Sequence, residues 1–493
     1  MNITKFIEFL NRTKGWGLKS DYYAHVEEWK QWWQGYFSAF HGYETRESDG
    51  STKKRQLYTM RMPKKICEDW ASLLLNERTG IVAADNGTQK WLMGDNETSG
   101  VLGDLQFWPK ANSLVELAFR SGTGAFVLGV DGVSVDRSNK VARSSDAKLY
   151  MDYLPAEYII PITVRHGEVV DVAFASEVVS GGKSCIYLQT HQLSAEGYVI
   201  SNEYFRGTSD NEESGSYIEA PLPPGMLKEI RTGSRVPWFA LLRPNVVKNR
   251  IGGAGLGMAV FAEAIDQVKA VDRAFNNLVK DLELGGKKVF YDQTLVRQEF
   301  ENGKIVTITP DDVMQQLFLQ MGDGEDAESK NPIHEYNPSL RIQENVDAVQ
   351  NALNYLSFKC GLGTRHYQFS GSNVTTATQY SGDRQDMRQN VAKHAIYVEQ
   401  ALQQIVRAIL WVGKTILGAP VDPDTEITVS FDDGYFTDNE TTRALMAQDV
   451  RDGILPKWKY AARWYDLDED AAKELVAEAG GSDDAPALFG GDA

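Results

Sequence analysis

One loop in the sequence gathers side chains that are well suited to touching a nucleic acid. It runs from Leu362 to Val374 and joins two helical patterns. It combines a cation, a titratable ring, aromatic rings and neutral hydrogen-bonding groups, a mixture that can contact a phosphate backbone without reading bases. An ordinary loop between two helices would account for the same composition. The candidate residues are Arg365, His366, Tyr367, Gln368, Phe369, Ser370, Ser372 and Asn373.

The rest of the sequence offers little catalytic chemistry. Gly182-Lys183-Ser184 and Gly413-Lys414-Thr415 have the ending of a phosphate-binding loop, but neither is preceded by the first glycine that this motif requires. The seven histidines form no metal-binding or catalytic motif. A turn after a strand explains the adjacent Asp432 and Asp433 without a metal ion. We therefore expect no catalytic residues, no cofactor and no metal site.

Composition indicates a soluble protein with real hydrophobic cores. The chain has 493 residues, enough for several domains, and 42% of them are hydrophobic. No apolar run has the length of a membrane span, and the first ten residues lack the pattern of a signal peptide. The cysteines are few and far apart, which predicts neither a disulfide framework nor a cysteine-based zinc site. We expect a protein that is made and used in a cytoplasm.

The net charge of −17 bears on any role with nucleic acid. Lys and Arg supply most non-specific affinity for DNA by neutralising phosphates, so a strongly acidic chain is not expected to wrap DNA tightly. An acidic wall would instead repel a polyanion and let it slide. Acidic charge is also common among soluble proteins, so it identifies nothing by itself.

Helical patterns flank the candidate loop. From Ile342 to Cys360, apolar residues recur at spacings of three and four, as on a helix that packs lengthwise on another helix. The same spacing resumes after the loop and continues to Leu417, and Thr376 with Gln379 is spaced as a capping box at its start. A third striped helix is expected from about Leu256 to Leu284, and it would pack antiparallel to the first. The predicted packing residues are Phe261, Ile265, Val268, Phe275, Ile342, Val346, Val349 and Leu353.

The remaining chain alternates helix and strand patterns, which predicts an α+β fold with several domains. Helices are expected over Tyr22–Trp33 and Met62–Glu77, with a charged loop at Glu44–Arg55 between them. Short β-rich runs between Tyr158 and Tyr204 are typical of antiparallel meanders. Two further strands and a helix near Asp311–Leu319 are expected in a small subdomain, and three short helices close the chain.

The order of these segments carries a family resemblance. Cys360-Gly-Leu-Gly, Tyr367-Gln-Phe and Thr375-Thr-Ala-Thr-Gln are similar to one region of the portal proteins of tailed bacteriophages. The most similar group is that of siphophages that infect Gram-positive hosts. Met62-Pro-Lys-Lys-Ile-Cys-Glu-Asp-Trp also resembles the N-terminal signature of the family. The resemblance extends over most of the chain.

The resemblance implies a division of the chain into the parts of a portal subunit. It would have an α/β wing, a two-helix stem, a small α/β clip, a tunnel loop, a long helix that completes the wing, an α-helical crown and a disordered tail. In such a subunit the tunnel loop faces a DNA channel, so Arg365 and His366 would meet the DNA. The implied boundaries are 1–250 for the first part of the wing, 251–284 and 341–360 for the stem, 285–340 for the clip, 361–375 for the tunnel loop, 376–436 for the rest of the wing, 437–480 for the crown and 481–493 for the tail.

The implied function is that of a non-enzymatic ring subunit at one vertex of a capsid. Twelve copies would form a channel that conducts double-stranded DNA inward during packaging and outward at ejection, without sequence specificity. The implied partners are further copies of the chain, the terminase large subunit, a head–tail adaptor, and the major capsid and scaffolding proteins. No membrane is implied. The protein would reside in the virion after assembly in the host cytoplasm.

Two other functions are compatible with the residues alone. One is a nucleic-acid-processing enzyme whose active site is not recognisable from motifs. The other is a different structural protein associated with the capsid, without an axial channel.

Overall fold

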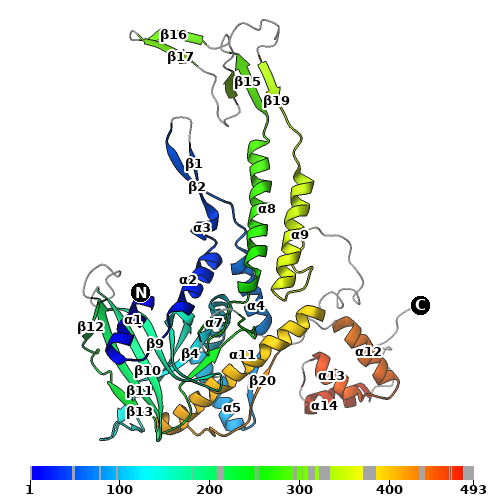
Figure 1. Ribbon diagram of the computed structural model, residues 1–493. Helices are drawn as coiled ribbons and strands as arrows, with labels where there is room; N and C mark the ends of the chain where they lie inside the picture. The colour runs from blue at the N-terminus through cyan, green and yellow to red at the C-terminus, as the bar shows by residue number, and fades with distance from the viewer. Residues whose placement is uncertain are drawn as a thin grey trace.

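Two helices rise side by side from a mixed base of sheets and helices (Figure 1). We call this pair the stem. The base comprises α1, α2, α4–α7, β3–β14, α11 and β20. The computed structural model describes residues 3–480 except 47–49, 77–78, 96–97, 181–182, 208–215, 250–251, 254, 293–296, 302–303, 309–316, 321–332, 370–384, 432–438, 466 and 468. The α+β class predicted from the sequence is confirmed.

The largest sheet in the described part of the chain has six strands, all of them antiparallel to their neighbours. Four strands follow one another in space as they do in sequence, and the last two both pair with β11. This arrangement confirms the predicted meander. The strands are β8 (Ile159–Arg165), β9 (Glu168–Ser180), β10 (Lys183–Ser194), β11 (Gly197–Gly207), β12 (Tyr217–Ala220) and β13 (Glu229–Arg231).

A second sheet, in the order β14–β4–β7, lies at the centre of the base. Its strands are β14 (Phe239–Leu242), β4 (Gly124–Asp131) and β7 (Lys148–Pro155). Two helices, α7 (Phe107–Ser121) and α11 (Gln385–Val412), pack against it. Phe126 and Leu128 of β4 are fully buried in this core. The sheet and these two helices therefore form one core, to which both halves of the chain contribute.

Helix α11 returns the C-terminal half of the chain to the base. After a π-helical turn at Gly413–Leu417, strand β20 (Ile427–Ser430) pairs antiparallel with β3 (Gly80–Ala83). The helix predicted up to Leu417 is confirmed from Gln385 onward, with its last turn in π geometry. Thr376 and Gln379, the predicted capping box, lie outside the described residues.

The stem consists of α8 (Ile265–Leu284) and α9 (Ile342–Lys359), which run antiparallel beside each other as predicted (Figure 1). Helix α8 begins later than the predicted Leu256, after a 3₁₀ turn at Ala262–Ala264. Before that turn, the backbone N–H of Val260 donates to the carbonyl of Phe119 at 2.9 Å. At this point the backbone is hydrogen-bonded to the end of α7 instead of to a preceding turn of α8.

The predicted stem stripe is confirmed over part of its length. Phe261, Val268, Val349 and Leu353 are buried, and Ile265 and Phe275 are partly buried. The prediction was wrong for Ile342 and Val346, which are 45% and 41% exposed. At their level the contact between the helices is polar, because Arg341 and Asn345 both hydrogen-bond the carboxylate of Asp281.

A segment predicted as a charged loop folds instead into a hairpin beside the stem. Strand β1 (Gly42–Arg46) pairs antiparallel with β2 (Thr52–Gln56). The hairpin follows α2 (Asp21–Gln34) and α3 (Ser38–His41), and the chain around it covers one side of α8. Asp272 is buried there: His41 lies 3.0 Å from one carboxylate oxygen, and the Met60 N–H donates to the other at 2.9 Å.

At the far end of the stem lie β15 (Lys288–Asp292), β18 (Leu317–Gln320) and β19 (Ile333–Tyr336) in one sheet, and β16 (Arg297–Glu301) paired with β17 (Lys304–Ile308). A helix was predicted near Asp311–Leu319; its last residues instead begin β18, and the rest of that range lies outside the described residues. The predicted closing helices are confirmed as α12 (Asn439–Arg451), α13 (Lys457–Tyr465) and α14 (Glu469–Gly480). The predicted tail, 481–493, is not among the described residues.

The shorter elements complete the base: α1 (Ile3–Lys14), α4 (Met62–Leu74), α5 (Asn86–Met93), α6 (Gly100–Asp104), β5 (Ser134–Val135) and β6 (Val141–Ala142). Among the described helices, none has both the length and the apolar run that a membrane crossing requires.

Candidate functional site: the loop after the stem

The candidate loop is described from Gly361 to Phe369, where it leaves α9 at the junction of the stem and the base. Gly361 and Gly363 have φ angles of +79° and +80°, the left-handed conformation that commonly ends a helix. The Leu362 N–H donates to the carbonyl of Ser357 at 3.0 Å, and the Ser357 hydroxyl donates to the carbonyl of Gly363 at 2.5 Å. The chain therefore reverses tightly at these glycines, as the break in periodicity predicted.

Asp69 of α4 fastens this loop to the base. Its Oδ2 accepts a hydrogen bond from the Tyr367 hydroxyl at 2.8 Å and lies 3.2 Å from Nε2 of His366. Its Oδ1 lies 2.5 Å from the ammonium of Lys65. Burial alone would raise the pKa of Asp69, but the hydrogen bonds from His366, Lys65 and Tyr367 outweigh burial and lower it. Asp69 is thus held as a carboxylate that binds three donors.

Trp70 and Asn390 hold the same turn from two further helices. The indole N–H of Trp70 donates to the carbonyl of Cys360 at 3.2 Å, and the Asn390 side-chain amide donates to that of Gly361 at 3.1 Å. The Trp70 ring also packs edge-on against His394 of α11, with ring centres 4.5 Å apart. The end of α9 is therefore bonded to both α4 and α11.

Beyond the turn, the loop folds back along α9. Gln350 donates to the carbonyl of Tyr367 at 2.7 Å and accepts from the Phe369 N–H at 3.3 Å. The Gln350 side chain thus supplies both a donor and an acceptor to the backbone of the returning loop. The loop is consequently fixed from three helices: α4, α9 and α11.

The candidate residues divide into an inward and an outward group. Tyr367 is buried and His366 is partly buried, and both are directed at Asp69. Burial, reinforced by the charge of Asp69, raises the pKa of Tyr367. Arg365, Gln368 and Phe369 are exposed. In this arrangement Tyr367 holds the loop together, and the outward side chains lie on its surface. Ser370, Ser372 and Asn373 lie outside the described residues.

Sequence reasoning missed Asp69, Trp70 and Asn390 as the residues that position the loop. Asp69 and Trp70 do stand in the segment that resembles the N-terminal signature of portal proteins, so that signal was available. Asn390 is one polar residue among many on α11 and carried no signal of its own.

The described cysteines and the buried histidine of the junction are poorly suited to catalysis. The thiols of Cys67 and Cys360 are buried, and burial raises the pKa of Cys67 well above its usual range and that of Cys360 to about 12. Such thiols remain protonated and are poor nucleophiles. His394 is buried, and burial together with Lys393 lowers its pKa to about 3. Within the described parts of the chain, no three His, Cys, Asp or Glu side chains are grouped to hold a metal ion.

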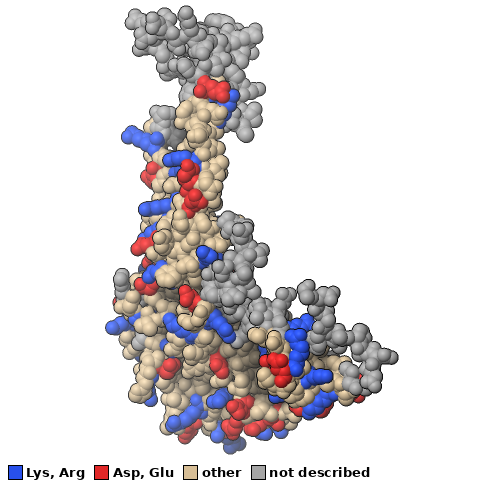
Figure 2. Space-filling model, turned by 90° about the vertical axis from the view of Figure 1, so that its right-hand side faces the viewer, with Lys and Arg blue, Asp and Glu red and all other residues tan. Residues whose placement is uncertain are grey.

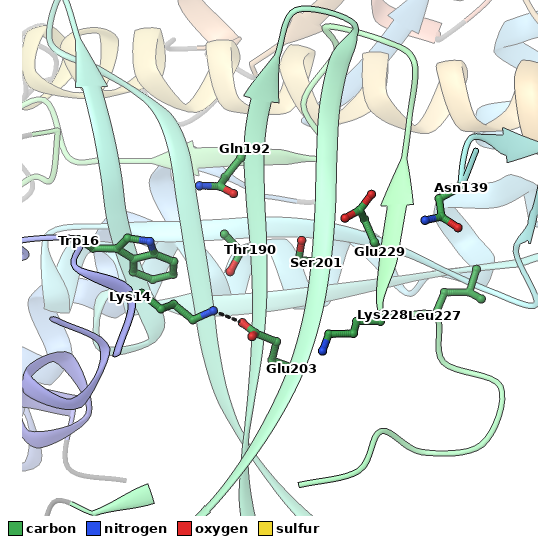
Figure 3. A pocket seen from close by; sticks show the side chains of 10 residues that line it. All are labelled: Lys14, Trp16, Asn139, Thr190, Gln192, Ser201, Glu203, Leu227, Lys228 and Glu229. Carbon is green, nitrogen blue, oxygen red and sulfur yellow. Dashed lines mark hydrogen bonds and ion pairs between the residues drawn. The ribbon is translucent and has the colours of Figure 1, made fainter. Parts of the chain in front are cut away.

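A separate hollow lies on the face of β10 and β11, with a volume of about 430 Å³ (Figure 3). Trp16 lies beside it, and Thr190, Gln192 and Glu203 project from the strands. Its charges are largely satisfied within the chain, since Lys14 forms an ion pair of 2.6 Å with Glu203. Charged and polar side chains line much of the hollow, beside Trp16 and Leu227, whereas clefts that bury small ligands are mostly apolar. It therefore ranks below the loop as a functional site.

Comparison with known proteins decides the family. Residues 228–484, more than half of the chain, match the family described as "Phage portal protein, SPP1 Gp6-like". The chain belongs to this family of phage portal proteins. Portal proteins of this family are structural rather than enzymatic, and this portal protein is accordingly a virion-associated component of an oligomeric assembly on the capsid.

Two other comparisons complete the survey of this portal protein. No curated protein matches it. Among solved structures it is similar to a chain from "Virion of native gene transfer agent (GTA) particle". The two are 11% identical, the similarity covers 85% of this chain and 88% of that chain, and the TM-score is 0.33.

Proposed function

We propose that this portal protein forms a ring at one capsid vertex, through which double-stranded DNA is packaged and later ejected. The observation that carries the proposal is the polar loop after α9, fixed by α4, α9 and α11 where the stem meets the base. A closed ring of head-to-tail copies repeats every surface around one axis. A loop held so firmly in each copy would form a collar of equivalent contacts around a central duplex.

The division of labour follows the parts of the chain. Residues 1–250 and 376–436 act as the wing, 251–284 and 341–360 as the stem, 285–340 as the clip, 361–375 as the tunnel loop and 437–480 as the crown. The pairing of β20 with β3 supports one wing made from both ends of the chain. The polar bonds of Arg341 and Asn345 to Asp281 support a stem that acts as one rigid strut.

Charge supports a channel that lets DNA move. Acidic and basic side chains are interspersed over the base and the stem, as Figure 2 shows for one face, and the chain as a whole is acidic. Tight, non-specific binding requires many cations facing the phosphates. One Arg365 and one Gln368 per copy supply a few weak contacts that guide the duplex without reading its bases.

The partners follow from the same proposal. Twelve copies would make the ring, assembled in the host cytoplasm with scaffolding and major capsid proteins. The strands at the far end of the stem are the most distant part from the base, and they would dock the terminase large subunit and later the head–tail adaptor. The terminase would supply the nucleotide hydrolysis that packaging consumes.

Electron microscopy of the purified protein tests this function. We expect annular particles with an axial opening, lined by residues 361–375. A particle without an opening, or one with this loop on its outer rim, would overturn the proposal. ATPase or nuclease activity that a single substitution abolishes would favour an enzyme instead.

A substitution tests the loop itself. We expect Arg365→Ala to leave rings intact and to weaken their retention of double-stranded DNA, with a smaller dependence on salt concentration. Arg165→Ala is the matched control, since Arg165 is also an exposed arginine and lies on the large sheet. Equal DNA retention by both variants would remove Arg365 from the channel.

A further inference from the structure

The β1–β2 hairpin is a highly exposed strand pair beside the stem. Every residue of β2 is exposed, and the hairpin stands away from the base on one flank of α8 (Figure 1). A two-stranded hairpin is marginally stable in water unless something packs on it. The hairpin therefore has a surface that a partner could cover.

The outward face of the hairpin carries two cations, Arg46 and Lys54, and one carboxylate, Glu44. Glu44 pairs with Lys54, and Arg46 with Thr52, across the two strands. Side chains alternate along a strand, so Arg46 and Lys54 share the face opposite to Tyr43. The Tyr43 ring packs against the ammonium of Lys280 on α8, at 4.9 Å. Arg46 and Lys54 consequently point away from their own stem, together with Glu44, which lies directly across from Lys54; Glu47 and Asp49 lie outside the described residues.

The other flank of the stem presents an acidic and aromatic stripe. On α9, Glu344, Asp347, Asn351, Tyr355 and Phe358 are all exposed and recur at helical spacing. They lie on the face opposite to the buried Val349 and Leu353, which pack toward α8. The rings of Tyr355 and Phe358 are 69% and 58% exposed. Large apolar side chains gain free energy when they are buried, so exposed rings of this kind often mark a surface that a partner covers. Within the described stem this face is exposed, and the Gln343 side chain of the same helix donates to Asp347 at 2.9 Å.

The basic and acidic surfaces lie at the same level of the stem. Lys280 contacts the hairpin through Tyr43, and the next residue, Asp281, bonds Arg341 and Asn345 in the first turn of α9. In Figure 1 the hairpin and α9 stand on opposite sides of α8. One flank of each subunit is thus complementary in charge to the other flank of an identical subunit at equal height.

We propose that the outward face of the β1–β2 hairpin docks on the Glu344–Asp347 turn of α9 in the next copy of this chain. This inference rests on the proposed ring and names the contact that closes it. Because the two surfaces differ, the contact is head-to-tail and propagates from copy to copy. Arg46 and Lys54 pair with the two carboxylates of that turn.

A cysteine pair measures the contact directly. The three native cysteines are buried, so Lys54→Cys with Glu344→Cys introduces the only accessible thiols of the described chain. Under a mild oxidant, we expect a ladder of covalent dimers, trimers and higher multimers in non-reducing gels. Either single variant should give none, and neither should Lys54→Cys with Glu474→Cys, which places the second thiol on an exposed site of α14.

The outcomes separate this contact from the proposed function. Rings in the microscope without a ladder would overturn the docking and leave the ring intact. Covalent dimers alone would overturn both, since a symmetric contact cannot propagate. If the charges of the hairpin serve only to keep its edge from pairing with other strands, no cross-link should form, and the docking would be overturned.

A charge exchange provides a second, independent measurement. We expect Arg46→Glu with Lys54→Glu to raise the protein concentration needed for half-assembly by about tenfold, because like charges then face each other. Adding Glu344→Lys and Asp347→Lys should restore assembly. Arg165→Glu with Lys459→Glu is the control, with the same change of net charge at exposed sites elsewhere. Normal assembly with loss of DNA retention would assign the hairpin to DNA and overturn the docking.

Discussion

The hydroxyl of Tyr367 donates a hydrogen bond of 2.8 Å to Asp69, 298 residues away along the chain. This bond joins the loop after α9 to helix α4. Because Tyr367 is buried, the bond is shielded from water, and it contributes to the position of every residue that the loop presents outward.

Removing that hydroxyl should loosen the loop. Tyr367→Phe leaves the ring in place but deprives the half-buried Asp69 of one of its three donors, at a cost of about 1–2 kcal/mol. Urea unfolding monitored by circular dichroism measures the change. Tyr355→Phe is the control, because Tyr355 is 69% exposed and should change stability by less than about 0.5 kcal/mol. Equal changes in the free energy of unfolding for the two substitutions would show that the Tyr367 hydrogen bond adds no stability beyond that of an exposed hydroxyl.

The turn at the end of α9 requires glycine at one position in particular. Gly361 has a φ of +79°, and a Cβ there would lie 3.2 Å from the Asn390 side chain. We expect Gly361→Ala to destabilise the subunit by at least about 1 kcal/mol. Gly286→Ala is the control, since nothing lies within 4 Å of its added Cβ and its φ is not positive. Thermal unfolding of both variants should show a lower midpoint for Gly361→Ala alone.

The stem stripe should have energetically distinct halves. Leu353 is fully buried, and Leu353→Ala should cost about 2–5 kcal/mol in the isolated subunit. Val346, which is 41% exposed, should tolerate alanine at a cost below about 0.5 kcal/mol. Denaturant titration of the unassembled protein distinguishes them. A large loss for Val346→Ala would mean that the stripe is packed along its whole length.

Acid should destabilise the fold through buried histidines. The Asn245 N–H donates to Nδ1 of His394 at 2.9 Å, and burial lowers the pKa of His394 to about 3. Since an unfolded histidine has a pKa of about 6.5, the unfolded state binds the extra proton between these values. Stability is thus full above about pH 6.5 and is lost as pH falls toward 3, by up to about 1.4 kcal/mol per pH unit. His191, whose pKa burial also lowers to about 3, adds a second such group.

A substitution isolates the contribution of His394. His394→Asn keeps an acceptor near the position of Nδ1 and removes the titration. Between pH 7 and 4, the slope of the unfolding free energy against pH should therefore fall by the equivalent of close to one bound proton. His166→Asn is the control: His166 is exposed, with a φ of +53° that asparagine tolerates. An unchanged pH dependence in His394→Asn would contradict the assignment.

The gap between the predicted and the observed site has a physical cause. Periodicity located the loop and its glycine turn correctly, because both are properties of neighbouring residues. It could not separate Tyr367 and His366, which hold the loop, from Arg365, which faces outward. That distinction depends on Asp69, which α4 brings to the loop only when the chain folds.

Local pattern alone determined much of this protein. The spacing of apolar residues determined the helices from Ile342 and Gln385 onward, and β-rich runs between turns determined the meander. Segment order also indicated the portal family. These features follow from interactions within a few residues, or within one strand and the next.

Tertiary structure decided what covers each surface. The carboxylate of Asp272 on α8 is buried where His41 and the Met60 N–H bond it, and Ile342 stays exposed beside the polar contact of Arg341 with Asp281, on a stripe that looks apolar. The spacing of apolar residues indicates which side chains gain from burial. The residues that bury them lie far away in the chain, and only folding and assembly bring them into contact.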